Sequence, residues 1–294
     1  MISPNTDPIE YIRNLSVSRG LPALTPPCQL SDIVVSFSGG KSSAFMVMLL
    51  EYNPYYANVK KHYVFANTGR EYAQTILFIK GVVDYAGIKL NMIESKTYLN
   101  ERKSSGYIIV DKVHELSMDG APFESMVTKY GLPSIAFPHC TRELKINPIR
   151  AFVKEELGMD DYTQALGMRF DEPKRIHMAR GFTYPLFDFG ITKKIVNDFW
   201  EVDALRGYAL GLEEHQGNCD LCFKKSWSKL QKVAKENIGA VSFWSNLEEK
   251  YSKGNGDEIY REHKTTKDLY AYTVDNKDIE CSCGFNEDSS FIKA

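Results

Sequence analysis

The sequence lacks any long hydrophobic run. The longest strictly apolar stretch, from Ala44 to Leu50, is far too short to cross a bilayer as a helix. The first thirty residues also lack the apolar core of a signal peptide, because Asp7, Glu10 and several prolines interrupt them. These absences argue against a membrane-spanning or secreted protein, and we expect a cytoplasmic one.

The chain also lacks an excess of charge of either sign. Its 36 Lys and Arg residues and 38 Asp and Glu residues leave a formal net charge of −2. The molecule as a whole therefore does not attract nucleic acid or anionic lipid over a long range. With 294 residues, 43% of them apolar and 25% charged, it has the composition of an ordinary globular protein. The length suits one large domain, alone or with a smaller appendage.

Cysteines are few, but four of the six stand close together in pairs. Cys219 and Cys222 form a C-x-x-C pair, and Cys281 and Cys283 form a C-x-C pair. In a reducing compartment, such pairs are more often metal ligands or catalytic groups than disulfides. Cys28 stands alone, and we expect it to be structural.

The stretch SFSGGKSSAF, residues 36 to 45, resembles a P-loop but lacks one of its glycines. A P-loop requires a glycine five positions before the glycine of its Gly-Lys-Ser triplet, and that position is Val35. Two glycines between a strand and a helix nevertheless expose backbone N–H groups to an anion, and the helix dipole favours its binding. Lys41 can add a positive charge, and Ser42 and Ser43 can donate hydrogen bonds.

The hydrophobic pattern predicts alternating strands and helices in the first hundred residues. The strands are expected at 32–37, 62–68 and 89–95, and the helices between them at 42–52 and 71–87. This order predicts an α/β fold with a Rossmann-like parallel sheet flanked by helices. Ligands of such folds bind beyond the carboxyl ends of the strands. The segments SGGKSS and ANTGRE both fall at those ends, so we expect them to share a site.

Further elements are expected at 122–131, 146–158, 191–200 and 241–252 as helices, and at 162–168 as a strand. Thr192 is a candidate N-cap. From Gly217 a cysteine knuckle leads into a lysine-rich helix. We therefore divide the chain into an N-terminal extension (1–30), a nucleotide-binding α/β domain (31–215) and a smaller helical region with cysteines and lysines (216–294).

Several motifs resemble those of one family, in the same order. SFSGGKSSA is similar to the pyrophosphatase loop, usually written SGGxDS, of the PP-loop adenine nucleotide α-hydrolase superfamily. Further matches to the phosphoadenosine-phosphosulfate (PAPS) reductase family are VFANTGREYAQT, CTRELKINP, ALGMRFDEPKR, YPLFDFGITKKIV and GNCDLCFKK. The chain thus resembles the PAPS reductase-like family over about residues 31–250, especially the branch common in phage genomes.

The resemblance implies an adenine nucleotide, either ATP or PAPS/APS, as the ligand. The nucleotide-binding residues that it implies are Ser38, Gly39, Gly40, Lys41, Ser42, Ser43, Asn67, Thr68, Gly69, Gly167 and Arg169. Lys41 is also expected to be catalytic, because it can stabilise the anion that develops at phosphorus or sulfur. Magnesium is the ion expected beside the phosphates, but Ser42 and Asn67 stand where relatives carry carboxylates that would bind it. Lys145 is a further candidate for a phosphate contact.

The same resemblance implies a metal centre. The spacing of Cys219 and Cys222 suits two ligands of one metal, and the family's iron–sulfur branch implies Cys140 as a third. The fourth ligand is left open between a tail cysteine, with Cys283 preferred, His139, and an open iron that holds the sulfur being transferred. Thiolate ligands suit a [4Fe-4S] cluster as well as zinc. Cys281 is the candidate catalytic nucleophile of a reductase.

A lysine-rich helix is expected directly after the cysteine knuckle. Lys225, Lys229 and Lys232 are predicted on one of its faces, where a nucleic acid could lie with a base near the metal. The resemblance implies a PP-loop enzyme that couples an adenine nucleotide to sulfur transfer or reduction, with a nucleic acid or nucleobase as one candidate acceptor. The alternative is a non-catalytic nucleotide-binding module with a structural metal site.

Overall fold

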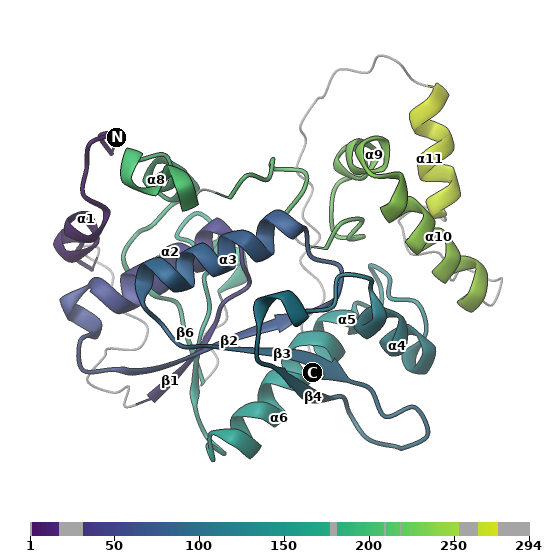
Figure 1. Cartoon of the computed structure of the whole chain (residues 1–294), viewed down its shortest axis with the longest axis horizontal. Helices are drawn as coiled ribbons and strands as arrows, with labels where there is room; N and C mark the ends of the chain where they lie inside the picture. Colours follow the sequence, from purple (N-terminus) through teal and green to yellow (C-terminus); the bar gives the residue numbers. More distant parts are fainter. Residues whose placement is uncertain are drawn as a thin grey trace.

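A six-stranded sheet lies at the centre of the molecule. The computed structural model describes residues 2–17, 32–176, 181–208, 210–217, 219–252 and 264–275. Within them the strand order is β4-β3-β2-β1-β5-β6 (Figure 1). The strands are β1 (Asp32–Ser36), β2 (Lys60–Asn67), β3 (Leu90–Lys96), β4 (Gly106–Val110), β5 (Thr163–Ala165) and β6 (Phe182–Thr183).

The sheet is parallel except at one edge. β1 pairs in parallel with β2 and β5, β2 with β3, and β5 with β6, whereas β3 and β4 are antiparallel. Val35 pairs with both Tyr63 and Ala165, so the carboxyl ends of the three central strands lie together. The predicted parallel α/β fold is confirmed, and the antiparallel edge strand β4 was not predicted.

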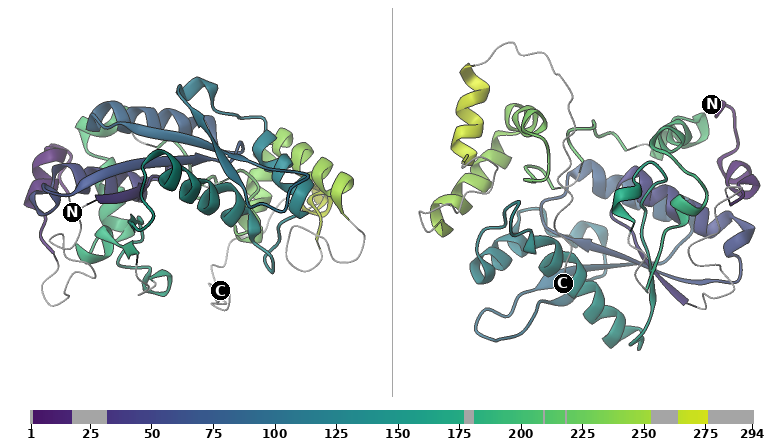
Figure 2. Two further views of the ribbon diagram at one scale, coloured as in Figure 1. Left: turned by 90° about the horizontal axis from the view of Figure 1, so that it is seen from below. Right: turned by 180° about the vertical axis from the view of Figure 1, so that it is seen from behind.

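Helices cover both faces of this sheet. The helices are α1 (Pro8–Asn14), α2 (Lys41–Tyr52), α3 (Ala73–Ala86), α4 (Ala121–Tyr130), α5 (His139–Thr141), a π-helix (Arg142–Ile146), α6 (Asn147–Glu156), α7 (Pro185–Asp188), α8 (Lys193–Trp200), α9 (Trp227–Glu236), α10 (Ile238–Tyr251) and α11 (Thr266–Asp275). α2 and α3 lie side by side on one face, and α6 covers the other (Figures 1 and 2). Among the described residues, no helix is long and apolar enough to cross a membrane.

The helix signals in the sequence have clear structural causes. Every residue of α2 from Ser43 to Leu50 is buried, because the helix packs against its neighbours α1, α3 and α8 as well as the sheet. This agrees with a helix that is apolar on all sides. Thr192 caps α8, since its hydroxyl accepts a hydrogen bond from Ile195 N at 3.4 Å. Gly87 ends α3 in the left-handed conformation.

The C-terminal helices share a hydrophobic core with the first part of the chain. α9, α10 and α11 bury Leu230, Trp244 and Leu269 against Phe123 of α4 and Leu144 of the π-helix. These three helices stand together beyond one end of the sheet (Figure 1). Among the described residues, the helical region expected from residue 216 is therefore packed onto α4 and shares its core with α4 and the π-helix.

Candidate functional site

The order in which the strands are added to the sheet reverses at β1, and the crevice at this point forms the first part of the site. β2 and β5 lie on opposite sides of β1, so the connections that leave β1 and β5 diverge at their carboxyl ends. Open α/β sheets bind ligands in the crevice at such a point. The segment Ser38–Ser43 follows β1, and the segment Gly167–Arg169 follows β5. The two motifs thus border the same crevice.

The Ser38–Ser43 loop has the backbone geometry of an anion site. Gly39 adopts φ +78°, and a Cβ there would lie 2.8 Å from Thr75 and Ile79 side-chain atoms of α3. Gly40 caps α2, and no side chain caps the N–H groups of that helix. These N–H groups point into the crevice and can bind an anionic oxygen. The Ser43 hydroxyl donates to Gly40 O at 2.9 Å and helps to fix the loop.

The segment after β5 touches the loop directly. A Cβ at Gly167 would lie 3.1 Å from Ser43 Cα, so a side chain there would force the two backbones a few tenths of an ångström apart. Arg169 donates from Nη1 to the Ser42 hydroxyl at 3.1 Å. The same guanidinium pairs with Asp171 at 3.0 Å and Glu172 at 3.3 Å, which hold it over the loop. A planar guanidinium in this position can bind a phosphate or sulfate.

Lys41 lies at the first turn of α2. Its ammonium lies 3.8 Å from the exposed Glu201 carboxylate, and its carbonyl accepts a hydrogen bond from Trp200 Nε1 at 3.0 Å. Because an ion pair with an exposed carboxylate is weak, the ammonium can turn towards an anion bound at the loop.

Asn67, at the end of β2, is part of a buried hydrogen-bond network. Its amide nitrogen donates to Glu94 Oε1 at 2.7 Å and to Ser117 O at 2.8 Å, and the residue is fully buried. Glu94 also accepts from the Ser117 hydroxyl at 2.8 Å. An amide suits this position because it can donate to the neighbouring carboxylate.

The segment that follows Asn67 connects the loop to the cysteines. The Thr68 hydroxyl lies 3.0 Å from Glu71 Oε1 and 3.3 Å from Cys219 Sγ. Glu71 lies 3.8 Å from Lys145 Nζ. Gly69 has φ +79°, and a Cβ there would meet Pro122 at 2.8 Å. This segment reaches α3, whose Thr75 packs against the Ser38–Ser43 loop.

Three cysteines lie near one another in this region. Cys140, Cys219 and Cys222 are free thiols, and each is half-buried. Burial raises the pKa of the Cys140 thiol, and Cys222 raises it further. Burial also raises the pKa of the Cys219 thiol, and so do the Glu71 carboxylate and, to a smaller extent, Cys222. Lys145 and the Thr68 hydroxyl act in the opposite direction without reversing the shift. Cys222 therefore lies within electrostatic reach of both other thiols.

Lys145 is the cation of this cluster. Desolvation lowers the pKa of its ammonium, but Glu71 and the neighbouring cysteines raise it by more, so the pKa lies above the usual range. Lys145 projects from the π-helix Arg142–Ile146, an irregularity that often marks a functional site. A charged Lys145 can stabilise a thiolate or an anionic leaving group here.

An ion pair attaches the cysteine knuckle to the rest of the site. Asp220, between the two cysteines, pairs with Arg70 and accepts a hydrogen bond from Trp244 Nε1 at 2.7 Å. The Arg70 guanidinium lies 4.1 Å from the centre of the Phe243 ring. These contacts join the Asn67–Glu71 segment, the knuckle and α10.

The sequence predicted Lys225 on one face of the helix that follows the knuckle, and this prediction is wrong. This residue precedes α9, is 9% exposed, and donates to Cys219 O at 2.8 Å and to Asp220 O. Burial lowers the pKa of its ammonium to about 8. Lys229 lies on α9 but pairs with Glu214 at 3.6 Å. Lys232 is exposed, near Glu236. Carboxylates thus accompany the two lysines that remain on this face.

The three thiols have the donor chemistry for a metal, but the arrangement does not bring donors to one point. Within the described residues, no group of three or more His, Cys, Asp or Glu side chains could hold a metal ion. The His139 ring contacts Gly131 O at 3.0 Å. Cys28, Cys281 and Cys283 lie outside the described residues.

A cavity that was not predicted opens beside the thiols. Its volume is about 570 Å³, and it lies between the start of α3 and the α9–α10 junction. Glu71 and Asp220 form part of its wall, so it adjoins the cysteine cluster. In the sequence, the only indication that Glu71 belongs to the site was its position as the acidic residue of ANTGRE.

Two sequence comparisons match the chain to known proteins. The family model described as "Phosphoadenosine phosphosulfate reductase domain" matches residues 32–182. An uncharacterised nin region protein, ORF290 of Escherichia phage lambda, is 34% identical over 210 residues, which cover 70% of each chain.

Two solved structures are partly similar. The PAPS reductase of Candida auris, in a phosphate complex, is 13% identical with a TM-score of 0.37, covering 60% of this chain and 75% of its own. The U34-tRNA thiolase NcsA of Methanococcus maripaludis, with its [4Fe-4S] cluster, is 16% identical with a TM-score of 0.37, covering 98% of this chain and 84% of its own.

Proposed function

Because the chain belongs to the phosphoadenosine phosphosulfate reductase domain family, we propose that it is an enzyme that couples an adenine nucleotide to sulfur transfer or reduction. The nucleotide, ATP or PAPS/APS, binds at the Ser38–Ser43 loop, and the sulfur chemistry takes place at the neighbouring cysteines. One observation carries the proposal: the segment 67–75 contacts Cys219 through Thr68 and the loop through Thr75.

The anionic end of the nucleotide is held by three kinds of group. Backbone N–H groups at the start of α2 bind its oxygens, helped by the helix dipole. Arg169 exchanges part of its contact with Ser42 for the ligand, and Lys41 adds a second charge. These cations stabilise the negative charge that develops on the leaving nucleotide.

The thiols supply the nucleophile. In a reduction, one thiolate attacks the sulfur of the sulfonucleotide, forming a sulfur–sulfur bond and releasing the nucleotide as its S–O bond breaks. A second thiol then releases sulfite and leaves a disulfide. In a transfer, ATP adenylates an acceptor and releases pyrophosphate, and the outer sulfur of a cysteine persulfide, loaded by a sulfane-sulfur donor, attacks the acceptor and displaces AMP. A second thiol then attacks the carrier cysteine's sulfur, which breaks the S–S bond, releases the thiolated acceptor and leaves a disulfide. Lys145 stabilises the thiolate in both versions, and Cys222 is the thiol whose charge raises the pKa of both others.

The metal content can be measured independently of the sulfur chemistry, because none of the proposed steps requires a metal. Anaerobic purification followed by iron, sulfide and zinc analysis tests whether Cys140, Cys219 and Cys222 hold a [4Fe-4S] cluster or zinc. Stoichiometric iron and sulfide support a cluster completed by a further ligand, and zinc alone supports a structural site.

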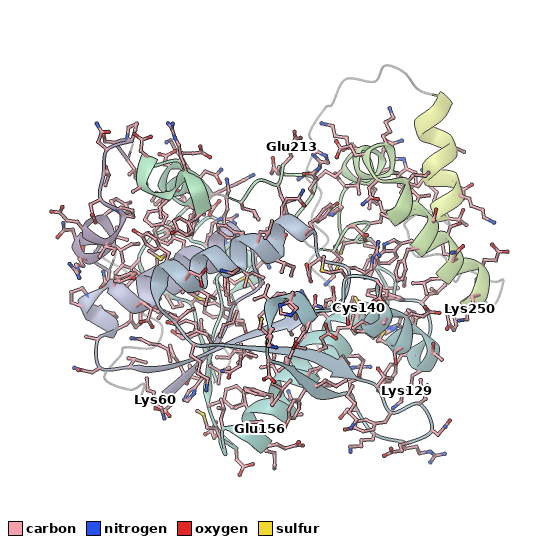
Figure 3. The ribbon with its side chains drawn as sticks, in the orientation of Figure 1. Lys60, Lys129, Cys140, Glu156, Glu213 and Lys250 are labelled. Atoms are coloured by element: carbon pink, nitrogen blue, oxygen red, sulfur yellow. The ribbon has the colours of Figure 1, made fainter. Side chains whose placement is uncertain are left out.

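Nucleotide binding is tested by calorimetric titration of ATP and PAPS. We expect Arg169→Ala to weaken the affinity at least roughly tenfold, because it removes a charge-assisted phosphate contact. Lys60→Ala is the matched control, since Lys60 starts β2 at the opposite end of the sheet (Figure 3). Equal affinities for the Arg169 variant and the wild type contradict the proposed nucleotide site.

One observation favours a second candidate, a non-catalytic nucleotide-binding module. The positions where relatives carry acids hold Ser42, which contacts Arg169, and Asn67, which is engaged with Glu94. Neither supplies a carboxylate for magnesium. This candidate predicts nucleotide binding without turnover, with the same affinity after Cys222→Ser. Turnover of PAPS or ATP that is lost in Cys222→Ser excludes it.

A further inference from the structure

A continuous surface of lysines and tyrosines extends from the β3–β4 connection towards Cys140. We call it the basic–aromatic surface and define it by Lys96, Tyr98, Lys103, Lys129 and Tyr130. The ammonium groups of Lys96 and Lys103 lie 5.5 and 4.0 Å from the centre of the Tyr98 ring. Lys129 lies 5.1 Å from the centre of the Tyr130 ring.

Hydrogen bonds join the two halves of this surface, which are distant in sequence. Lys129 Nζ donates to Lys103 O, and the Tyr130 hydroxyl donates to the same carbonyl at 3.4 Å. The connection 97–105 is therefore fixed against the end of α4. Cations and rings alternate along this surface, which is the composition of sites that bind single-stranded nucleic acids.

The surface leads to the thiols. The Tyr130 ring lies 6.3 Å from the ring of His139, the residue that precedes Cys140. On the far side of Cys140, Lys224 Nζ donates to Thr141 Oγ1 at 3.2 Å. Figure 3 shows Lys129 and Cys140 in the same part of the molecule, away from Lys60. A chain bound along this surface would therefore pass the cysteine cluster.

Charge is strongly biased along the surface, although the protein as a whole is nearly neutral. Within residues 96–105 and 129–146 the acidic side chains are Glu101 and Glu143, and Glu143 is buried. The exposed Arg102 adds further positive charge in the same segments, whereas Arg142 is paired with Glu143 at 2.7 Å. On α9, in contrast, Lys229 is paired with Glu214.

Exposed apolar side chains accompany these charges. Phe137, three residues before Cys140, is 72% exposed, and Leu99 in the β3–β4 connection is 52% exposed. A flat ring such as that of Phe137 can stack on an unpaired base.

We propose that the basic–aromatic surface binds a single-stranded nucleic acid and presents it to the thiols around Cys140. The proposal rests on the proposed function, because the bound strand would be the acceptor in the sulfur chemistry. A single strand fits better than a duplex, since the bases of a duplex are stacked on one another and cannot stack on Tyr98 or Phe137.

The test is fluorescence anisotropy with 5′-labelled 15-nucleotide dT and U strands, at several salt concentrations. For a single strand, each phosphate contact contributes about 0.7 to the slope of log K against log salt. We therefore expect the double variant Lys103→Ala/Lys129→Ala to bind roughly tenfold more weakly at 0.1 M salt, with a slope smaller by about 1.4. The matched control is Lys229→Ala/Lys232→Ala on α9, which should bind within twofold of the wild type.

The aromatic part is tested by Phe137→Ala, whose ring is exposed and can be removed without opening a core. Loss of one stacked base should weaken binding roughly tenfold, and the salt slope should stay unchanged because no charge is removed. Circular dichroism melting checks that each variant is folded. Unfolding of one variant leaves the other two to decide the result.

The outcomes separate this inference from the proposed function. If the surface variants bind the strands as tightly as the wild type, or if a 15-base-pair duplex or phosphatidylserine vesicles bind better than the strands, the inference is wrong. ATP and PAPS titrations of the same variants decide the nucleotide site independently. Retained nucleotide affinity with unchanged strand binding overturns only the inference.

Discussion

At the scale of single residues, the two departures from the family's acidic pattern have different surroundings. Ser42 lies on the loop, 3.1 Å from the Arg169 guanidinium, whereas Asn67 is fully buried and donates to Glu94 at 2.7 Å. A carboxylate at position 42 would gain a cationic partner. A carboxylate at position 67 would face another carboxylate out of water.

We therefore expect Asn67→Asp to lower the free energy of unfolding by about 3 kcal/mol, because it buries an unpaired charge beside Glu94. Ser42→Asp is the control and should change stability by no more than about 0.5 kcal/mol. Urea denaturation of both variants at pH 7 measures the difference. Equal stability of the two variants would contradict the role given to Glu94.

Glu143 provides a prediction about pH. Burial alone would raise the pKa of its carboxyl, but hydrogen bonds from Arg142, Ser105 and Asn147 lower it to about 2. Since this lies below the unfolded value of about 4.3, the carboxylate stabilises the fold above that pH, and this contribution disappears as the pH falls towards 2.

Glu143→Gln should therefore cost up to about 3 kcal/mol of stability at pH 7, and much less near pH 3. Denaturation of the wild type and the variant at both pH values gives the comparison. Arg150→Gln, in the exposed part of α6, is a charge control. A deficit of the Glu143 variant that is the same at pH 3 and pH 7 would show that its ionisation does not matter.

The position of the Ser38–Ser43 loop between β1 and α2 could be predicted, but the arrangement of the thiol cluster could be predicted only in part. Gly39 and Gly40 are easy to recognise, because two glycines between a strand and a helix indicate a tight loop that exposes backbone N–H groups. The sequence placed Lys225 on a helix face, whereas the chain buries it against Cys219 O. Helical periodicity could not reveal this, since residue 225 lies in a turn before α9.

At the scale of elements, the contact between the end of β5 and the start of α2 shapes the site. A methyl group at Gly167 would lie 3.1 Å from Ser43 Cα, so in Gly167→Ala the backbone of the loop must shift by a few tenths of an ångström. We expect this variant to weaken ATP or PAPS binding roughly tenfold or more, because the phosphate ligands lose their alignment. Titration calorimetry measures the affinity.

Gly207→Ala is the matched control for Gly167→Ala. A Cβ at Gly207 meets no atom within 4 Å, and neither glycine has a positive φ. The control should bind the nucleotide like the wild type. A Gly167 variant that binds equally well would mean that the loop can shift without loss of function.

Periodicity predicted the central elements well, because α2 is buried all round in one core, and β1 and β2 bury their apolar residues in the cores on both faces of the sheet. It missed β4, whose Ile108 and Ile109 are both largely exposed, so the strand has no alternating buried face. The π-helix Arg142–Ile146 was also missed, since no local signal distinguishes it from the start of α6. Its geometry depends on contacts such as that of Glu143 with Ser105 at 2.8 Å.

At the scale of the whole molecule, the sheet was predictable and the attachment of the C-terminal helices was not. Alternating strands and helices imply a parallel sheet wherever they occur. The packing of α9 and α10 onto α4 depends on pairs that are far apart in sequence, such as Phe123 and Trp244, whose ring centres lie 4.8 Å apart. Asp220 adds the hydrogen bond to Trp244 that joins this core to the cysteine knuckle.

This shared core predicts that the sheet and the C-terminal helices unfold together. Trp244→Ala should lower the free energy of unfolding by about 3–5 kcal/mol, since it leaves a large cavity and removes the partner of Asp220. Fluorescence and circular dichroism should still follow one transition, shifted to lower urea. Ile238→Ala is the control on the same helix, because Ile238 is 57% exposed and should cost far less. The opposite outcome is a Trp244 variant in which the helices unfold first, while the sheet keeps the wild-type midpoint and nucleotide affinity. That outcome would show that the helical region is a separate unit and that the thiols of the knuckle can move away from the nucleotide site.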